Sequence, residues 1–284
     1  MKKQSPLLLN LITPAFRTHR KRFAANGVKN VFILSTGRTG TTYLAKLFDR
    51  QKGIRAVHEP KPSRILRMWS MAHFDGKVSS DFMRSVIYDK RSRLYSSVTD
   101  KTYVESNPFI TGFTDVLQDV FDKPIVIHVV RDPRDYVKSS MNHGNGQGLK
   151  LFFNKFVPYW LPKSDKEVPM RYRAATFWKI VNQSLVDYGK RHPENYHLIK
   201  YEDIFSGKQK GVDELATIIG IDKVKLKKSM QSKAGMNKSR HNAVASWQEW
   251  SDYDCKKVNE LCQPLMQQFG YGLEDEWQQR VSKN

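Results

Sequence analysis

The chain has 284 residues, with 48 Lys and Arg against 28 Asp and Glu, which gives a formal net charge of +20. Its hydrophobic fraction of 39 %, with only 16 glycines and 12 prolines, excludes a disordered, collagen-like or low-complexity chain. The two cysteines, Cys255 and Cys262, are about two helical turns apart, which excludes a disulfide within one helix and leaves too few thiols for a zinc cluster. We expect both to be small buried hydrophobic side chains.

The N-terminal segment is basic and in part apolar. Residues 1–30 carry seven Lys or Arg and no acid, and residues 4–16 are uncharged. This uncharged stretch contains Pro6 and Pro14, is shorter than the roughly 20 apolar residues that span a membrane, and is not followed by a small-residue cleavage pattern. We expect it to pack on the domain, with a weak contact to an acidic membrane surface as the alternative.

The rest of the first half alternates predicted strands and helices. Short apolar runs predict strands at 31–34 and 54–57 and, more weakly, at 103–104. Apolar residues at helical spacing predict one helix that starts after Gly40 and another over 63–74.

The second half continues this alternation. Residues 125–130 are almost all β-branched, which is typical of a strand buried on both faces of a parallel sheet. Helices are predicted after Pro133, over 171–191 and over 253–269, with a further strand over 196–199. The pattern predicts the α/β class, with a central parallel sheet flanked by helices.

No linker rich in glycine, proline or serine divides the chain, so we expect a single domain over 1–284. It comprises the basic N-terminal segment 1–30, a core over 31–205 and a helical C-terminal part over 206–284. Residues 223–248 carry seven further Lys or Arg and no acid. Together with the N-terminal run they favour a polyanionic ligand, whether nucleotide, nucleic acid, sulfated or uronate glycan, or membrane.

The segment after the first strand reads Ser35-Thr36-Gly37-Arg38-Thr39-Gly40-Thr41-Thr42. Its glycines allow the backbone to approach a ligand and to turn into a helix, whose first free amides point at an anion. Hydroxyl groups and the Arg38 guanidinium surround the same place. The segment therefore predicts an anion-binding loop, with an ordinary strand-to-helix turn as the alternative.

Two common nucleotide-binding patterns are not met by this segment. In the nucleotide-triphosphatase pattern, Ser35 stands in place of the first glycine and Thr41 in place of the lysine that holds the terminal phosphates. In the dinucleotide fingerprint started at Gly37, Thr39 and Thr42 occupy the other two glycine positions. The sequence therefore disfavours hydrolysis of ATP or GTP and binding of a dinucleotide.

Three segments together resemble the sulfotransferase family. Residues 37–44 resemble the loop by which these enzymes bind the 5′-phosphosulfate of PAPS (3′-phosphoadenosine 5′-phosphosulfate), and residues 126–139 are similar to their 3′-phosphate segment. Residues 200–204, after a strand, are similar to the family's Tyr-Glu-Asp sequence. The resemblance implies a P-loop-NTPase-like architecture, PAPS as co-substrate with PAP (the desulfated nucleotide) as product, and no metal. It assigns nucleotide contacts to Gly37, Arg38, Thr39, Gly40, Thr41, Thr42, Arg131 and Ser139.

The chemistry of these side chains fits the implied roles. Arg131 leaves its strand at the carboxyl end, where ligands bind in open α/β sheets, and its planar fork suits a phosphate. Ser139 lies about two helical turns on and can reach the same group. A salt bridge of Arg131 with Asp132 or Asp135 is the alternative. Arg38 is expected to stabilise the charge that develops on the bridging oxygen as the 5′-phosphate leaves.

The acceptor hydroxyl needs a general base. In family members that act on small phenols and steroids a His follows the third strand, but residues 105–108 contain none. His58-Glu59-Pro60 resembles instead the Glu-Pro element of carbohydrate-type members, which implies Glu59 as the base. His58 and Glu105 are alternatives as bases, and a surface or ion-paired carboxylate is the alternative role of Glu59. His128 is expected to be structural.

Two cations of the second basic run are expected to contact the same nucleotide. By analogy with members that close the site with a basic C-terminal loop, Lys238 and Arg240 are predicted to contact the 3′-phosphate. A solvated basic loop is the alternative.

We therefore predict a PAPS-dependent sulfotransferase that acts on a hydroxyl of a carbohydrate or another anionic acceptor, closer to carbohydrate and bacterial members than to phenol and steroid members. A P-loop kinase relative and a non-catalytic polyanion-binding protein are the alternatives. No nucleic-acid-binding motif is present beyond basicity, so no nucleic-acid partner is expected. We expect a bacterial cytoplasmic protein, because PAPS is made there, with a Golgi-lumenal domain as the second possibility.

Overall fold

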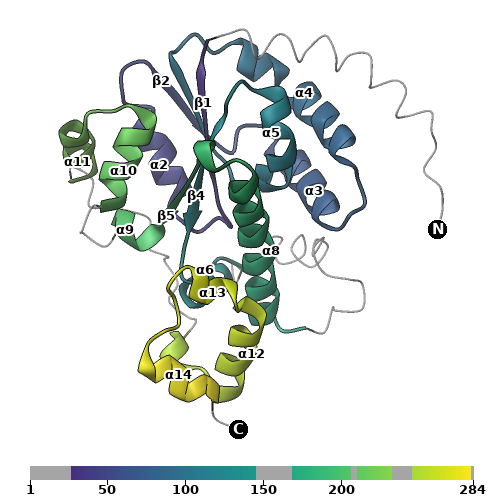
Figure 1. Cartoon of the computed structure of the whole chain (residues 1–284), viewed down its shortest axis with the longest axis vertical. Helices are drawn as coiled ribbons and strands as arrows, with labels where there is room; N and C mark the ends of the chain where they lie inside the picture. The colour runs from purple at the N-terminus through teal and green to yellow at the C-terminus, as the bar shows by residue number, and fades with distance from the viewer. Residues whose placement is uncertain (1–26, 145–167, 206–209, 232–244, 283–284) are drawn as a thin grey trace.

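Five strands form one parallel sheet in the order β2-β3-β1-β4-β5 (Figure 1). The structure is a computed structural model and describes residues 27–144, 168–205, 210–231 and 245–282. The predicted α/β class with a central parallel sheet is confirmed. The strands are β1 (Lys29–Leu34), β2 (Ile54–His58), β3 (Thr102–Ser106), β4 (Ile125–Val130) and β5 (Tyr196–Lys200).

All five predicted strands are present. The strand predicted most weakly, at 103–104, is longer than expected. β3 is a five-residue strand that is buried along its whole length between β1 and β2. Its fourth residue is Glu105, and this charge weakened the apolar pattern in the sequence. Most of the basic N-terminal segment, together with Lys238 and Arg240, lies outside the described residues.

Helices connect the strands and cover the sheet. Across the described ranges, no helix has the length and apolar character that a membrane span requires. The helices are α2 (Thr41–Phe48), α3 (Ser63–Phe74), α4 (Ser80–Ser96), η1 (Pro108–Phe113), α5 (Thr114–Val120), α6 (Pro133–Gly144), α8 (Met170–Arg191), η3 (Pro193–Asn195), α9 (Tyr201–Phe205), α10 (Lys210–Ile219), α11 (Lys223–Gln231), η4 (Trp247–Glu249), α12 (Asp252–Cys262), α13 (Leu265–Gln268) and α14 (Asp275–Ser282).

Both faces of the sheet are covered. Figure 1 shows α2, α10 and α11 on one face and α3, α4, α5 and α8 on the other. Side chains of β1 alternate between the two resulting cores: Val31 and Ile33 pack with the first set of helices, and Phe32 and Leu34 with the second. Strands buried in this way are largely apolar, which is why β1 and β4 were recognisable in the sequence.

The C-terminal helices build a third apolar cluster on α8 and α6. Trp178 of α8 packs there with Trp250 and Trp277. Cys255 and Cys262 belong to the same cluster, and both are buried free thiols, as predicted. In Figure 1 these helices gather around one end of α8, beside α6.

The predicted helix over 253–269 is wrong in its extent. α12 ends at Cys262, and Gln263 takes an extended backbone with ψ 155°. The cause is Pro264, which has no amide hydrogen and disfavours a helical residue before it. A short helix, α13, resumes at Leu265.

Candidate functional site

The site lies where β1 and β4 end side by side. The two strands are paired from Val31–Ile125 to Leu34–His128. After β1 the chain continues towards β2 at one edge of the sheet, and after β4 it continues towards β5 at the other. Ligands of open α/β sheets bind at such a switch point, beyond the carboxyl ends of the strands.

Three residues of the loop after β1 have a left-handed backbone conformation. Gly37, Arg38 and Gly40 have φ values of 78°, 59° and 73°. The hydroxyl of Ser35 holds the turn, since it accepts hydrogen bonds from the Gly37 amide at 3.0 Å and from the Thr39 hydroxyl at 2.8 Å. Two glycines meet the need for positive φ, whereas Arg38 takes the same conformation at a steric cost.

The loop ends in a helix whose first amides are not capped. Gly40 is the N-cap of α2 and has no side chain to satisfy them. A Cβ atom at this position would lie 2.5 Å from Cζ of Phe205. An uncapped N-terminus directs N–H groups and the positive end of the helix dipole at whatever lies beyond it, which favours an anion.

Arg38, Arg131 and Ser139 come together beside this helix start. Nε of Arg38 donates to the Ser139 hydroxyl at 3.1 Å, and Nη1 of Arg131 donates to the main-chain oxygen of Arg38 at 3.0 Å. The Arg131 guanidinium also lies over the ring of Tyr201, 4.5 Å from its centroid. Burial and the nearby charge of Arg131 lower the pKa of Arg38. Two like charges are thus held close together.

The charge of Arg131 is only weakly compensated. Its Nη2 is 4.0 Å from the Asp135 carboxylate, at the outer limit of an ion pair, and its buried Nε has no hydrogen-bond partner. Burial and the neighbouring Asp132 raise the pKa of Asp135, so the charged form of this carboxylate is disfavoured. Asp132 itself pairs with Arg134 at 2.6 Å. The expected alternative, a salt bridge of Arg131, exists only in this weak form.

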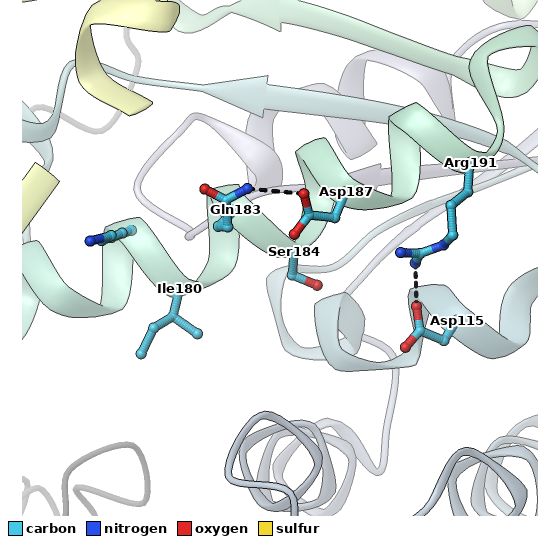
Figure 2. Close-up of a pocket in the computed structure, with 7 residues that line it drawn as sticks. Asp115, Ile180, Gln183, Ser184, Asp187 and Arg191 are labelled. Atoms are coloured by element: carbon cyan, nitrogen blue, oxygen red, sulfur yellow. Dashed lines mark hydrogen bonds and ion pairs between the residues drawn. The ribbon is translucent and has the colours of Figure 1, made fainter. Parts of the chain in front are cut away.

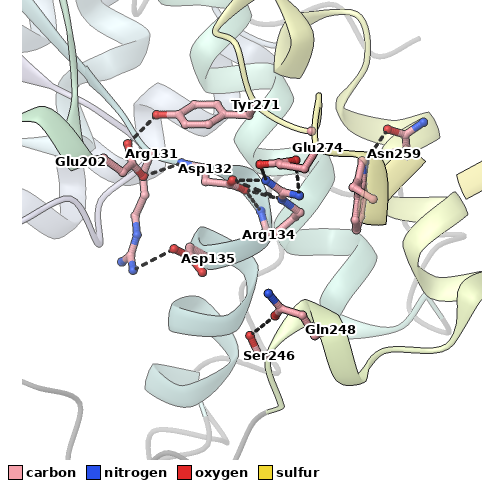
Figure 3. Close-up of polar contacts among 12 residues, drawn as sticks. Arg131, Asp132, Arg134, Asp135, Glu202, Ser246, Gln248, Asn259, Tyr271 and Glu274 are labelled. Atoms are coloured by element: carbon pink, nitrogen blue, oxygen red, sulfur yellow. Dashed lines mark hydrogen bonds and ion pairs between the residues drawn. The ribbon is translucent and has the colours of Figure 1, made fainter. Parts of the chain in front are cut away.

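Arg134 of α6, which the sequence did not single out, anchors the C-terminal part (Figure 3). It is 2 % exposed and pairs with Asp132 at 2.6 Å and with Glu274 at 2.8 Å. Its guanidinium lies over the rings of both Trp247 and Trp277, at 4.7 Å and 4.9 Å from their centroids. The C-terminal helices are therefore tied to the residue next to Arg131.

Glu202 forms a second link between the Arg131 turn and the C-terminal part of the chain. Its carboxylate accepts the Asp132 amide at 3.2 Å and the Tyr271 hydroxyl at 2.6 Å (Figure 3). The predicted Tyr-Glu-Asp segment thus supplies two neighbours of the Arg131 turn, namely Tyr201 under the guanidinium and Glu202 at the following amide.

Glu59 stands at the ends of the neighbouring strands β2 and β3. Its backbone is left-handed with φ 42°, and its amide donates to the Ser106 carbonyl at 3.3 Å. Its side chain is 30 % exposed and lies 3.5 Å from Nε2 of His58. It is thus neither buried nor a free surface carboxylate.

His58 links Glu59 to the phosphate loop. Nδ1 of His58 is 2.9 Å from the Ser106 carbonyl, so this nitrogen carries a proton and donates. In the neutral ring Nε2 then accepts from the Thr42 hydroxyl, 2.8 Å away. Through this ring the start of α2 and the loop that carries Glu59 are in direct contact.

Arg67 of α3 is a further cation on this side that the sequence analysis missed. Its guanidinium lies over the Phe109 ring, 5.2 Å from the centroid. Burial lowers its pKa, whereas the nearby Tyr136 and Glu59 raise it. Its position on α3, eight residues after Glu59, was the available signal, but only the packing of α3 on η1 turns it inward.

The reserve base Glu105 is not available to an acceptor. It is fully buried and accepts hydrogen bonds from Tyr95, Tyr103 and Asn107 at 3.1 Å, 2.8 Å and 2.8 Å. Its carboxylate also pairs with Arg91 at 3.4 Å. A carboxylate surrounded by donors and closed off from solvent cannot reach a substrate hydroxyl.

His128 is structural, as predicted. It is buried in β4, donates from Nε2 to Asn182 Oδ1 at 2.7 Å and accepts the Tyr196 hydroxyl at Nδ1, also at 2.7 Å. Burial lowers its pKa to about 4. Both ring nitrogens are thereby used inside the protein.

A separate open cavity of about 430 Å³ lies along α8 (Figure 2). None of its lining residues belongs to the loops that follow the strands, and Arg191 and Asp115 close one end through a 2.6 Å ion pair. The cavity is lined by Asp115, Lys179, Ile180, Gln183, Ser184, Asp187 and Arg191.

In the described ranges no three His, Cys, Asp or Glu side chains gather as metal ligands.

The comparisons with known proteins agree with this geometry. The model of the sulfotransferase family matches residues 30–225. No curated protein sequence matches the chain.

Several solved structures are similar at low identity. The sulfotransferase domain from the curacin biosynthetic pathway is 16 % identical, with 90 % of this chain and 96 % of that chain covered and a TM-score of 0.47. Sulfotransferase STF1 from Mycobacterium tuberculosis is 13 % identical over 78 % of this chain and 76 % of its own, with a TM-score of 0.49. Mouse sulfotransferase SULT7A1, complexed with PAP, is 17 % identical over 78 % and 69 %, with a TM-score of 0.41.

The family model spans more than half of the chain and includes the phosphate loop, Glu59 and the Arg131 turn. The chain therefore belongs to the sulfotransferase family.

Proposed function

We propose that the protein transfers the sulfuryl group of PAPS to a hydroxyl of a carbohydrate or another anionic acceptor. The observation that carries the proposal is the meeting of Arg38, Arg131 and Ser139 at the adjoining ends of β1 and β4. PAPS carries two separate anionic groups, and this edge of the sheet offers a helix start and a guanidinium cluster next to each other.

The nucleotide roles follow from this arrangement. The uncapped start of α2 and the loop before it would hold the 5′-phosphosulfate, and Arg131 with Ser139 would hold the 3′-phosphate. Lys238 and Arg240 stay predicted as further contacts to the 3′-phosphate, outside the described residues. The residues proposed to hold the 5′-phosphosulfate are Gly37, Arg38, Thr39, Gly40, Thr41 and Thr42.

The reaction is an in-line displacement at sulfur. The acceptor oxygen forms a bond to sulfur while its proton passes to the Glu59 carboxylate, and the bond between sulfur and the 5′-phosphate oxygen breaks. Negative charge grows on that leaving oxygen, and Arg38 stabilises it. Like phosphoryl transfer, such a reaction depends mainly on positioning and on charge stabilisation, and this scheme assigns no step to a metal.

The acceptor side supports an anionic substrate. Glu59 stands there with Arg67 nearby, a cation whose pKa is lowered by burial, an effect that the Glu59 carboxylate opposes. A carboxylate or sulfate of the acceptor would find a counter-charge in Arg67 while its hydroxyl faces Glu59. Because the reaction consumes PAPS, we propose the bacterial cytoplasm as its compartment.

A thermal-shift comparison of PAP, AMP and ATP tests the nucleotide. PAP at a concentration of 100 Kd should stabilise the fold by about 2.7 kcal/mol, and AMP and ATP at the same concentration by much less. Stabilisation by ATP with magnesium alone would point to a kinase relative. No shift with any nucleotide, together with salt-sensitive binding of polyanions, would point to a non-catalytic binder.

A further inference from the structure

A buried charge network lies beneath the loop that follows β2. Glu105 on β3 and Arg91 on α4 are both closed off from solvent, and Arg91 Nη2 is 3.4 Å from Glu105 Oε1. Asn107 donates to the same oxygen at 2.8 Å, while the hydroxyls of Tyr95 and Tyr103 donate to Oε2 at 3.1 Å and 2.8 Å. Burial and the Glu105 carboxylate raise the pKa of both hydroxyls, so they remain donors.

Arg91 joins this network to the loop. Its Nη1 donates to the main-chain oxygen of Lys61 at 2.7 Å. Lys61 follows Glu59 by two residues, and α3 begins two residues later at Ser63. The guanidinium is therefore a bridge between a fixed strand-end carboxylate and the short loop that carries Glu59.

The backbone of Glu59 needs such a bridge. A non-glycine residue in the left-handed region is strained and persists only where the surrounding structure fixes it. On one side the Glu59 amide is held by the Ser106 carbonyl, and on the other side Lys61 is held by Arg91. We propose that Arg91, itself oriented by Glu105, is a positioning residue that keeps the Glu59 carboxylate where it meets the acceptor hydroxyl. The inference rests on the proposed role of Glu59 as the base.

Arginine suits this role, and lysine does not. The guanidinium presents donors in a rigid plane and serves the Lys61 carbonyl and the Glu105 carboxylate at once, whereas an ammonium is a single centre at the end of a flexible stem. The variant Arg91→Lys therefore keeps the positive charge beside Glu105 and removes the bridge to Lys61.

A double-mutant cycle of Arg91→Lys and Glu59→Gln tests the proposal. PAP formation from labelled PAPS is measured with neutral and uronate-bearing oligosaccharides as acceptors and with water alone as the basal acceptor. Arg91→Lys should lower kcat about 10-fold or more, because displacement of a catalytic group by about 1 Å is costly. The KM for PAPS and the affinity for PAP should stay within about twofold. In the Glu59→Gln background Arg91→Lys should have no further effect on kcat, since it acts through the residue already removed.

Tyr103→Phe is the matched control. It removes an equally buried hydrogen bond from the same carboxylate, at Oε2 rather than at the Oε1 atom that pairs with Arg91, and leaves the hydrogen bond between Arg91 and Lys61 in place. It should lower the melting temperature without changing kcat per folded molecule. If Arg91→Lys yields no folded protein, Arg91→Gln, whose shorter and neutral side chain also breaks the bridge between Lys61 and Glu105, takes its place in the same cycle.

The proposal is overturned if Arg91→Lys leaves kcat per folded molecule unchanged, or if it slows Glu59→Gln by the same factor as the unmutated enzyme. The first result would show that Arg91 does not affect turnover. The second would show that Arg91 affects turnover independently of Glu59. Full activity of Glu59→Gln alone would remove the base assignment and this role with it. If Glu59→Gln alone lowers turnover by a factor on the order of 10² or more while the cycle gives either of these two results, the base assignment stands and only the role of Arg91 is lost.

Discussion

The carboxyl edge of the sheet is divided into two electrostatically different halves. Beyond β1 and β4 two guanidiniums approach each other, and the carboxylate nearest to Arg131, that of Asp135, is 4.0 Å away. Beyond β2 and β3 the cation Arg91 is paired internally with Glu105, which leaves Glu59 as a partly exposed carboxylate. In the proposed function, the first half binds the anionic donor, and Glu59 of the second half accepts the proton of the acceptor hydroxyl. Such a transfer requires both groups side by side.

The two carboxylates of the second half show how packing decides a role. Glu105 pairs with Val57 in the register of β2 and β3, so Glu59 lies only two positions further along the neighbouring strand. Glu105 is enclosed by four donors under α4, whereas Glu59 extends past the last strand residue. The chemical group is the same, but only Glu59 is accessible.

The largest effect on turnover is expected from a change to Glu59, the carboxylate on the proton-accepting side. Glu59→Gln keeps the shape of the side chain and removes its basicity, so turnover should fall by a factor on the order of 10² or more. PAP binding should remain, because the amide does not touch the guanidinium half. PAP formation and PAP titration on the same preparation measure both. Unchanged turnover would remove Glu59 from the mechanism.

The second largest effect is expected from a change to Arg131, on the anion-binding side, and concerns the affinity for PAP. Arg131→Ala removes charge-assisted hydrogen bonds worth about 1.5–3 kcal/mol, so the affinity for PAP should fall roughly 10- to 100-fold. AMP, which lacks the 3′-phosphate, should lose much less. Calorimetric titration of both nucleotides gives the ratio. An equal loss for PAP and AMP would contradict the assignment of Arg131 to the 3′-phosphate.

A smaller effect sharpens the comparison within the phosphate loop. Gly40→Ala places a Cβ atom 2.5 Å from Phe205 in a residue with φ 73°, so it should destabilise the fold by about 2 kcal/mol and weaken PAP binding. Gly53→Ala is the matched control, because Gly53 has φ 77° and nothing within 4 Å of its Cβ position. It should cost about 1 kcal/mol and leave PAP binding intact. Equal effects of both variants on PAP affinity would show that Phe205 does not constrain the loop.

The sequence predicted local structure better than contacts between distant residues. The roles of Arg38, Arg131 and Ser139 were implied by the family resemblance and stay predictions. The strand over 125–130 and the helix over 63–74, by contrast, were predicted to the residue from local apolar patterns. Such features depend on neighbours in sequence, and sequence patterns carry that information.

The contacts that the sequence did not predict join distant parts of the chain, in both halves of the sheet edge. Nothing in the spacing of Arg91 and Lys61 predicts their hydrogen bond across 30 residues, nor that of Arg134 with Glu274 across 140. Glu105 and Glu59 were both acceptable bases on paper, because only the packing of α4 on β3 buries one of them. The role of Pro264 was available in the sequence and was overlooked.

The smallest expected effect concerns the neutral histidine beneath the anion-binding half. His128 has a pKa of about 4 in the folded protein, against about 6.5 in an unfolded chain, so the unfolded state binds more protons between these values. Its contribution to stability is present above pH 6.5 and is lost as the pH falls towards 4. Between pH 7.5 and 6 the loss from this group amounts to about 0.8 kcal/mol. Asn182, which accepts from His128, also donates to the carbonyl of Trp178. The Trp178 indole donates to the Arg131 carbonyl, so a chain of hydrogen bonds joins His128 to the site. Urea unfolding of the wild type and of His128→Gln at both pH values isolates this term, because glutamine does not titrate. The wild type should lose about 0.8 kcal/mol more than the variant, and equal losses would mean that folding does not lower the pKa of His128.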